Sequence, residues 1–442
     1  MSNVQTIIEP ERKIPVVGEW DAVVCGGGPS GFIAAIAAAR GGARTLLIHE
    51  HGFLGGMATA ALVGPISKFR AGGRRIVGGI AWEFVERMHR AGGAVIDLPS
   101  GNVPFDPEIY KYVSLKMVRE AGVDLRLHTR AVGCLTNPED GGQIDYVLVE
   151  NASGRQAIKC GYVVDATGTG AIAHRAGLPC RLRTDAKGNL QPLSLIFRLG
   201  GVDTDNLTVW MEKDGVKYAN QELKKALQRE VEKGNLRQFG GPWTVFGSTI
   251  RRGEVSVNAT RFAGNATDAE SLTAAEIEMR EDVMKMIGIF RRVSPQFSNC
   301  YLIDTAAQSG VRETRMIEGL YTMTLDDILN PKDFPDTIAR GAHWIDIHQA
   351  QNSEQSATVV NESYNIPYRA IIPFHSKNLL VAGGSISASK EAFASIRVQA
   401  QCMAIGEAAG TAVASCSRRK IAVNSIDGEL VNALLASSGA LV

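Results

Sequence analysis

The stretch HWIDIH at residues 343–348 combines two histidines with a carboxylate. The pKa of histidine suits proton transfer near neutral pH, so either ring could act as a general base. Asp346 and His348 are two residues apart, and on a strand they would share one face. We predict that His348 accepts a proton in catalysis, with His343 as the second candidate. The alternative is a His–Asp hydrogen bond that only holds the structure together.

Arg312 and Lys390 are the cationic candidates. Arg312 opens the polar cluster RETR at residues 312–315, where its guanidinium, or that of Arg315, could hold a carboxylate or polarise a carbonyl. Lys390 could bind substrate or stabilise a negatively charged cofactor. The alternatives are an ion pair between two domains for the arginines, and a solvated lysine beside a helix start for Lys390.

A glycine-rich turn near the N-terminus has the composition of a phosphate-binding loop. Gly26, Gly28 and Gly31 follow the pattern G-x-G-x-x-G, which permits a tight turn, a close approach of pyrophosphate and close packing of the next helix. Pro29 suits the first position of a helix, and Ser30 follows it. A helix over 29–40 would direct its free N–H groups and the positive end of its dipole at phosphate oxygens.

The elements around this turn must position it. Residues 21–25 are short and apolar, as in a buried parallel strand, and residues 45–49 predict a second strand. Glu50 ends that strand, nineteen residues after Gly31, where a carboxylate can accept the hydroxyls of an adenosine ribose. The unit predicts an ADP-containing dinucleotide. A glycine-rich turn in an unrelated α/β protein would leave Glu50 unexplained.

Later segments predict the rest of the fold. Alternating stretches at 131–134 and 144–151 indicate a β-meander inserted into the dinucleotide-binding fold. Short strands are expected at 162–165 and 378–382, and a small-residue helix over 394–415, which would point a second helix N-terminus at the cofactor. Between them, strands at 192–200, 243–258 and 301–305 and a long helix over 272–293 indicate a different domain. We expect three parts: residues 1–187, 188–370 and 371–442.

Composition narrows the function. The chain has 442 residues, with 47 Lys+Arg against 46 Asp+Glu, a balance that argues against nucleic acid or an anionic membrane as the main partner. No apolar run approaches the ~20 residues of a membrane span, and the N-terminus lacks a secretory pattern, so we expect a cytoplasmic protein. The seven cysteines include no C-x-x-C, which excludes a zinc ribbon, an iron–sulfur run and a redox dithiol. No metal site is predicted.

Several motifs carry a resemblance over essentially the whole chain. The chain resembles a bacterial FAD-dependent oxidoreductase family of the glutathione-reductase-type flavoprotein superfamily. The flavin-bearing subunit of heterodisulfide reductase and the fumarate reductase flavoproteins are more distant relatives. The motifs are EPERKIPVVGEWDAVVCGGGPSG at the start, HGFLGGMATAALV after Glu50, VVDATGTG at 163–170, QPLSLIFRLGGVD at 191–203, GVRETR at 310–315, IARGAHWIDIH at 338–348, YNIPYRAIIP at 364–373 and NLLVAGGSISASKEAFASIRVQAQCMAIGEAAGTA at 378–412.

The resemblance implies FAD and a set of residues around it. The turn at 26–31 and Glu50 would hold the ADP half, and the loop after Glu50 would lie along the ribityl chain and flavin ring. His51 stands where the family commonly has an aromatic or basic residue, and a covalent link to the flavin there is an alternative. The histidine expected at position 390 is replaced by lysine. The remaining predicted contacts are Gly55, Gly56, Met57, Thr59, Ala166, Thr167, Gly168, Gly383, Ser395 and Ile396.

The fold class expected is α/β: a Rossmann-like FAD-binding domain with a β-meander insertion, plus a mixed α+β substrate domain. The expected function is oxidation of a C–H bond next to O or N in a small polar molecule, with hydride passing to flavin N5. Electrons would then go to oxygen or a separate carrier, because no second glycine pattern offers a site for NAD(P)H. The alternatives are a flavin-dependent reductase or monooxygenase, and an FAD-bearing electron-transfer subunit. A homo-oligomer is possible.

Overall fold

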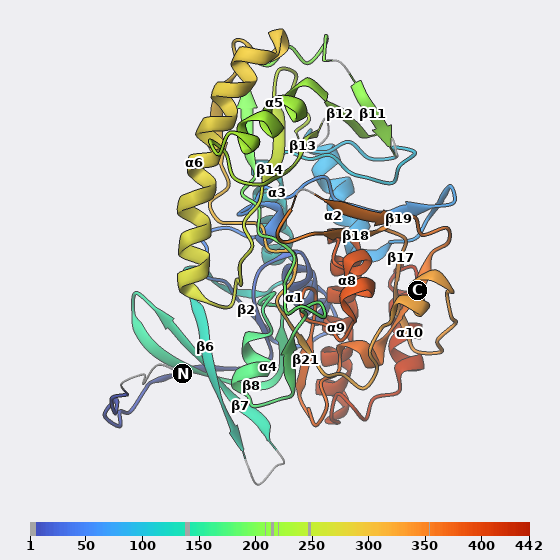
Figure 1. The fold of residues 1–442 in the computed structure, drawn as a ribbon. Coiled ribbons are helices and arrows are strands. Elements are labelled where there is room, and N and C mark those ends of the chain that lie inside the picture. Colours follow the sequence, from blue (N-terminus) through green and yellow to red (C-terminus); the bar gives the residue numbers. More distant parts are fainter. Residues whose placement is uncertain are drawn as a thin grey trace.

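The computed structural model describes residues 6–137, 142–207, 209–213, 216–219, 221–245, 249–352 and 354–442. Two large β-sheets and the helices packed on them organise these ranges. Figure 1 shows strands β6 to β8 of the first sheet in the lower half of the view, and the second sheet in the upper half beside the long helix α6.

The first sheet has the strand order β5-β2-β1-β8-β7-β6, with β21 paired to β8. Strands β5, β2, β1, β8 and β21 are parallel, and β6 and β7 form an antiparallel meander that runs into β8. The members are β1 (Val16–Cys25), β2 (Thr45–Ile48), β5 (Asp124–Arg126), β6 (Arg130–Asn137), β7 (Gln143–Asn151), β8 (Gly154–Asp165) and β21 (Leu379–Val381).

Three strands of this sheet end at the same edge. Cys25 at the end of β1 and Val381 at the end of β21 both pair with Asp165 at the end of β8. Because carboxyl ends of parallel strands line the ligand crevice of open α/β sheets, the segments that follow Cys25, Asp165 and Val381 converge on one place.

Successive side chains of β1 point to opposite faces of the sheet, so the strand contributes to two hydrophobic cores. Ala22 and Val24 belong to the core cluster that contains α1 (Pro29–Arg40) and α9 (Gln399–Arg419). Val23 and Cys25 face the opposite core, with Ile144 and Val147 of the meander. The short apolar strand is therefore buried on both faces, as its composition predicts.

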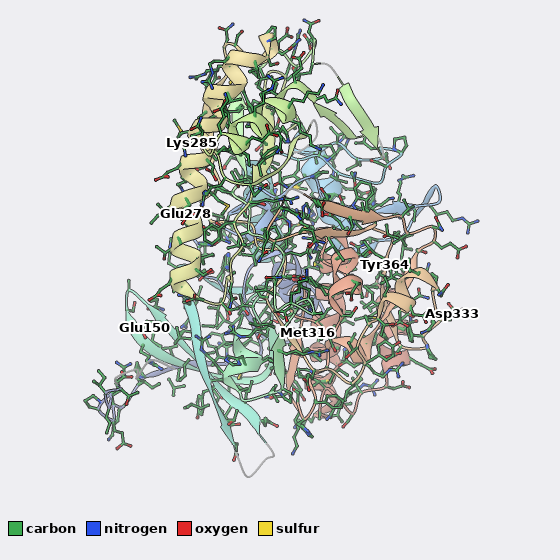
Figure 2. The ribbon with its side chains drawn as sticks, in the orientation of Figure 1. Glu150, Glu278, Lys285, Met316, Asp333 and Tyr364 are labelled. Atoms are coloured by element: carbon green, nitrogen blue, oxygen red, sulfur yellow. The ribbon has the colours of Figure 1, made fainter. Side chains whose placement is uncertain are left out.

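The second sheet has the order β11-β12-β13-β14-β10-β15 and is antiparallel. Helix α6 (Ala269–Val293) packs Met279, Val283 and Phe290 into a shared core with the sheet, whereas Lys285 points away from it (Figure 2). The other members are β10 (Phe197–Gly200), β11 (Val209–Lys213), β12 (Val216–Ala219), α5 (Gln221–Glu232), β13 (Phe239–Val245), β14 (Val255–Thr260) and β15 (Tyr301–Thr305).

Shorter elements connect the sheets. The two-stranded pairs are β3–β4, β16–β9, β17–β20 and β18–β19. Their bounds, with those of the remaining helices, are β3 (Arg70–Ala71), β4 (Arg74–Arg75), α2 (Gly79–Arg90), α3 (Pro107–Glu120), α4 (Ala171–Arg175), β9 (Cys180–Leu182), β16 (Arg315–Ile317), α7 (Leu325–Leu329), β17 (Thr337–Gly341), β18 (Ile345–His348), β19 (Gln355–Thr358), β20 (Tyr364–Pro367), α8 (Lys390–Ile396) and α10 (Gly428–Ser437), with 3-10 turns at Gly56–Ala58, Pro295–Phe297 and Tyr368–Ile371.

The expected fold class is confirmed, with a parallel cofactor-type sheet, its meander and a second sheet-rich part. Several expected elements differ. The strand predicted over 192–200 is shorter, because β10 begins only at Phe197. The helix predicted over 394–415 is two helices, α8 and α9, which break at Arg397 and Val398. The strand predicted over 243–258 is parts of β13 and β14, and residues 246–248 between them lie outside the described residues. The division at residues 187/188 and 370/371 stays a prediction.

Two observations concern what the described residues lack. Among them, no helix combines the length and apolar character that crossing a membrane requires. The same ranges contain no group of three or more His, Cys, Asp or Glu side chains placed to hold a metal ion.

Candidate functional site: a dinucleotide cradle beside a cationic cavity

The turn between β1 and α1 leaves space where a phosphate would bind. Gly26 has a φ of +108°, and a Cβ there would meet the backbone of Ala166. A Cβ on Gly31 would collide with the carbonyl oxygen of Gly26, so only glycine lets the helix approach the strand. A Cβ on Gly28, in contrast, would meet only the Cα of Gly56, at 4.0 Å. Space beside Gly28 and a helix start without a side-chain cap fit a pyrophosphate.

Two other glycine segments reach the same turn. Gly55 and Gly56 have φ values of +110° and +48°, and a Cβ on Gly56 would lie 2.8 Å from the Cα of Gly28. Gly168 has a φ of +75° with open space around its missing Cβ, and a Cβ on Gly383 would collide with the hydroxyl of Ser30. The structure therefore brings the predicted segments at 26–31, 55–56, 168 and 383 together.

Side chains in these segments hold the backbone in place. The Thr59 hydroxyl donates to the carbonyl of Leu54 at 2.8 Å, and the Thr167 hydroxyl donates to Asp165 at 2.6 Å. The N–H of Ala166 donates to the carbonyl of Cys25 at 2.9 Å. Because these hydroxyls already donate to groups of the protein, contact with a cofactor here would come from backbone groups.

Glu50 lies just beyond β2, and its side chain is 47% exposed with Arg130 Nε 3.4 Å from its carboxylate. Its role in binding a ribose stays a prediction. Nearby, His51 Nε2 is 2.9 Å from the side-chain oxygen of Gln308.

The preceding His49 was not predicted to matter, because one histidine in a strand carries no signal of its own. Its Nδ1 accepts a hydrogen bond from the N–H of Gly27 at 3.0 Å and so fixes the glycine turn. Burial lowers the pKa of His49 to about 3, which keeps the ring neutral and Nδ1 able to accept.

The second helix N-terminus is that of α9, preceded by Val398 without a side-chain cap. Ser395 and Ile396 are fully buried in α8, and their contact with a cofactor stays a prediction. The Ser395 hydroxyl is 2.7 Å from that of Tyr364, which Figure 2 labels beside α8. The neighbouring Val398 and Gln399 line the cavity described next.

A cavity of about 880 Å³ lies between the cofactor cradle and the second sheet. Met57, Val398 and Gln399 line one side, next to the cradle, and the N–H of Val311 is 3.4 Å from Met57 Sδ. Further walls come from the segment before β10, from β14 and from the β18–β19 hairpin. The lining includes Ser194, Asn258, Arg312, His343, Asp346 and His348. The residues predicted to do chemistry from 312 and from 343–348 are thus in one cavity.

His343 presents a free ring nitrogen to this cavity. Its Nδ1 is 2.8 Å from the carbonyl oxygen of Trp344, and only a protonated Nδ1 can donate to a carbonyl. Nε2 therefore carries the lone pair, and it has no partner among the described residues. Burial lowers the pKa of His343 to about 4, so the ring is neutral at neutral pH.

His348 has both ring nitrogens engaged. Arg261 donates to its Nδ1 at 2.8 Å, which leaves Nε2 protonated and donating to Asp346 at 3.0 Å. Burial, with Arg312 nearby, lowers the pKa of His348 to about 3. The expected His–Asp pair on one strand face is present, but His348 has no lone pair to offer a substrate, so His343 is the better proton acceptor.

Arg312 lies in the cavity wall, and one of its terminal nitrogens donates to the Pro192 carbonyl at 2.5 Å and the Ser194 hydroxyl at 2.8 Å. Lys390 is elsewhere: it forms an ion pair with Glu313, and the two side chains are 10% and 0% exposed. Lys390 also donates to the carbonyl of Asn189 at 3.2 Å. The structure places Lys390 in a buried ion pair outside the cavity.

Two further arginines make contacts that the sequence did not indicate, because nothing local distinguishes them from surface arginines. Arg397, at the break between α8 and α9, donates to the carboxylate of Asp346 at 3.2 Å and lines the cavity. Arg183 is 2% exposed, donates to the carbonyls of Gly384, Ile386 and Ala388, and thereby holds the loop after β21.

Comparisons with known proteins agree with a flavin site. A family model described as FAD dependent oxidoreductase matches residues 21–435. No curated protein matches the sequence.

Among solved structures, the geranylgeranyl bacteriochlorophyll reductase-like protein of Thermoplasma acidophilum has 13% identity and a TM-score of 0.46, over 95% of this chain and 82% of that one. The p-nitrophenol 4-monooxygenase of Pseudomonas putida has 9% identity and a TM-score of 0.47, and the match covers 96% of this chain and 84% of the monooxygenase. The myxobacterial chondrochloren halogenase has 14% identity and a TM-score of 0.47, and the match covers 95% of this chain and 79% of the halogenase. TM-scores below 0.5 carry no weight for function.

Proposed function

We propose that this chain, which belongs to the FAD dependent oxidoreductase family, oxidises a C–H bond next to oxygen or nitrogen in a small polar molecule. The protein is an FAD-dependent enzyme on the strength of its family; the direction of its reaction and the class of bond are the proposal. The observation that carries it is the cavity of about 880 Å³, whose lining combines Met57 and the α9 N-terminus with His343.

The residues that would hold FAD fit it. The uncapped N-terminus of α1 and the space at Gly28 would take the pyrophosphate, and Glu50 the ribose. The α9 N-terminus, which opens on the cavity, would stabilise negative charge on the ring. When bound, FAD supplies a hydride acceptor, N5, and an exit for the electrons to oxygen or a carrier.

The chain's own part in the chemistry is proton transfer and orientation. Nε2 of His343 would take the proton from the O–H or N–H next to the C–H bond that is oxidised, so a proton and a hydride leave the substrate together. Asp346 and His348 would act through position: His348 orients Arg261, and Asp346 orients Arg397.

Anaerobic mixing of the holoenzyme with small hydroxy acids, alcohols and amines tests the proposal. Bleaching of the flavin absorbance without NAD(P)H is the expected result. Bleaching that requires NAD(P)H would favour a reductase or a monooxygenase instead. A flavin that no small molecule reduces, in a protein that copurifies with a partner, would favour an electron-transfer subunit.

We also propose that the chain is of the glutathione-reductase type within the flavoproteins, distantly related to the flavin-bearing subunit of heterodisulfide reductase and to the fumarate reductase flavoproteins. The support is the meander β6–β7 that enters β8, and the return of β21 beside β8.

A further inference from the structure

We propose that the substrate carries a carboxylate, and that Arg312 binds it through the edge formed by Nε and the second terminal nitrogen. The inference rests on the proposed function, because it names the substrate class of the same cavity. It depends on three observations: the unused edge of Arg312, the unbalanced positive charge of the cavity, and the placement of His343.

Arg312 is held by only one of its three guanidinium nitrogens. That nitrogen donates to the Pro192 carbonyl at 2.5 Å and to the Ser194 hydroxyl at 2.8 Å, and both acceptors are uncharged. Nε and the other terminal nitrogen have no partner among the described residues. These two N–H groups are parallel and match the two oxygens of a carboxylate, so the guanidinium is oriented in advance for a bidentate contact.

The cavity has more positive than negative charge where Arg312 lies. Asp346 accepts from Arg397 at 3.2 Å, from His348 at 3.0 Å and from Gln355 at 2.5 Å, so its carboxylate is already engaged. Glu354 is the second acid of the lining. The two acids are outnumbered by four basic residues, Lys68, Lys224, Arg312 and Arg397. Arg312 and Lys68 are half-buried, and neither has a carboxylate in direct contact among the described residues. Partial burial of an unpaired cation is costly, and an anionic substrate would reduce that cost.

The electrostatic state of Arg312 agrees with this geometry. Burial, together with the neighbouring Arg397 and Arg261, lowers the pKa of Arg312 to about 9. A guanidinium in that position stabilises a bound anion more than a guanidinium in water would, because the surroundings screen the charge less.

Lys68 extends the positive surface to the exterior. It lines both this cavity and a smaller pocket of about 230 Å³, whose lining also includes Arg70. The exposed Arg74 and Arg75 lie on the same β3–β4 hairpin. A basic surface of this kind attracts anions and raises their association rate at low salt. When Arg312 binds the carboxylate of a small substrate, the other end of that substrate is available to His343.

The test is titration of the FAD-loaded enzyme with unreactive acids, followed by the change in flavin absorbance. Acetate and malonate are compared with acetamide and malonamide, and inorganic phosphate distinguishes carboxylate from phosphate chemistry. We expect saturable binding of a carboxylate, with the matching amide at least about tenfold weaker. Arg312→Gln should weaken carboxylate binding at least about tenfold and leave the affinity for FAD unchanged.

Arg340→Gln is the matched control, because Arg340 donates to the carbonyl of Val442 and lies outside the cavity lining. Equal binding of acid and amide, tighter binding of phosphate than of any carboxylate, or loss of FAD affinity in Arg312→Gln would each overturn the inference. Carboxylate binding without flavin bleaching by any substrate would instead count against the proposed oxidation alone. Bleaching by neutral alcohols only would keep the oxidation and refute the carboxylate.

Discussion

The carbonyl oxygen of Ser30, in the first turn of α1, occupies the space that a side chain at Gly406 of α9 would need. The helix that begins the cofactor cradle and the helix that completes it are therefore in backbone contact. Gly406, 376 positions after Ser30, therefore determines how closely α9 can pack against the phosphate-binding turn.

Gly406→Ala should destabilise the protein, because a Cβ in that contact forces α1 and α9 apart. Overpacking of this kind typically costs about 1–3 kcal/mol. Gly288→Ala in α6 is the matched control: its Cβ would meet only the side-chain tip of Arg292, at 3.5 Å, and removal of a mid-helix glycine is stabilising by up to about 1 kcal/mol. Urea unfolding of both variants measures the difference, and equal stability would contradict the contact.

Gly28→Ala should separate folding from cofactor binding. The φ of Gly28 is −71° and its Cβ would be 4.0 Å from the nearest neighbour, so the apoprotein should unfold at an unchanged denaturant concentration. The added methyl would fill the space proposed for pyrophosphate, and FAD affinity should fall by at least tenfold, or about 1.4 kcal/mol. Fluorescence titration with FAD gives the affinity, and unchanged binding would place the phosphates elsewhere.

The sequence predicted those elements whose signals are local. The helix at Pro29–Arg40 and the strand at Tyr301–Thr305 have the predicted bounds, since a glycine turn and an apolar run define them. The break at Arg397 and Val398 was missed, because neither proline nor glycine marks it. Arg397 instead donates to the carbonyl of Asp346, a tertiary contact across 51 residues of sequence.

In the candidate site, too, the sequence predicted local relationships but not tertiary contacts. The spacing of Asp346 and His348 correctly predicted that they share one strand face, and there they form the hydrogen bond that was the alternative to a catalytic His348. It could not show that Arg261, 87 residues away, donates to the other ring nitrogen and so removes the lone pair of His348. Which histidine can accept a proton depends on those contacts, and they place the free nitrogen on His343.

His343→Gln should lower kcat by about 10²–10⁴-fold, since it removes the proton acceptor. The pKa of His343, near 4, also predicts a pH profile. The ring accepts a proton only when neutral, so kcat/KM should be level from neutral pH downwards and fall below about pH 4. A fall centred near pH 6.5 would indicate an unburied histidine. His348→Asn, which perturbs Arg261, should change KM more than kcat.

Lys390→Met should test whether Lys390 is structural. The substitution leaves Glu313 buried without its cation, and loss of one partner of a buried pair costs about 3–5 kcal/mol. Adding Glu313→Gln removes the orphaned charge, and the neutral side chain can still accept from the N–H of Gln191, so the double variant should recover much of the loss. If Lys390→Met is stable but substrate no longer bleaches its flavin, Lys390 is catalytic rather than structural.

Glu407→Gln should change the pH dependence of stability. Glu407 is 2% exposed in α9, and one carboxylate oxygen accepts from the N–H of Ile80 at 2.9 Å, while the other is buried without a partner in the described ranges. Burial raises the pKa of Glu407 to about 7, so the folded state holds a proton that the unfolded chain releases near pH 4.5. Its stabilising contribution is thus complete below about pH 4.5 and is lost as pH rises to about 7.

The comparison of wild type with Glu407→Gln isolates this carboxyl from the buried histidines, whose lowered pKa values act in the opposite direction, with stability lost as pH falls below 6.5. Between pH 5 and 7 the stability difference between the two proteins should change by up to about 1.4 kcal/mol per pH unit, in favour of the variant as pH rises. Urea unfolding across that range measures it. A difference that does not vary with pH would mean that Glu407 stays ionised in its buried position at α2.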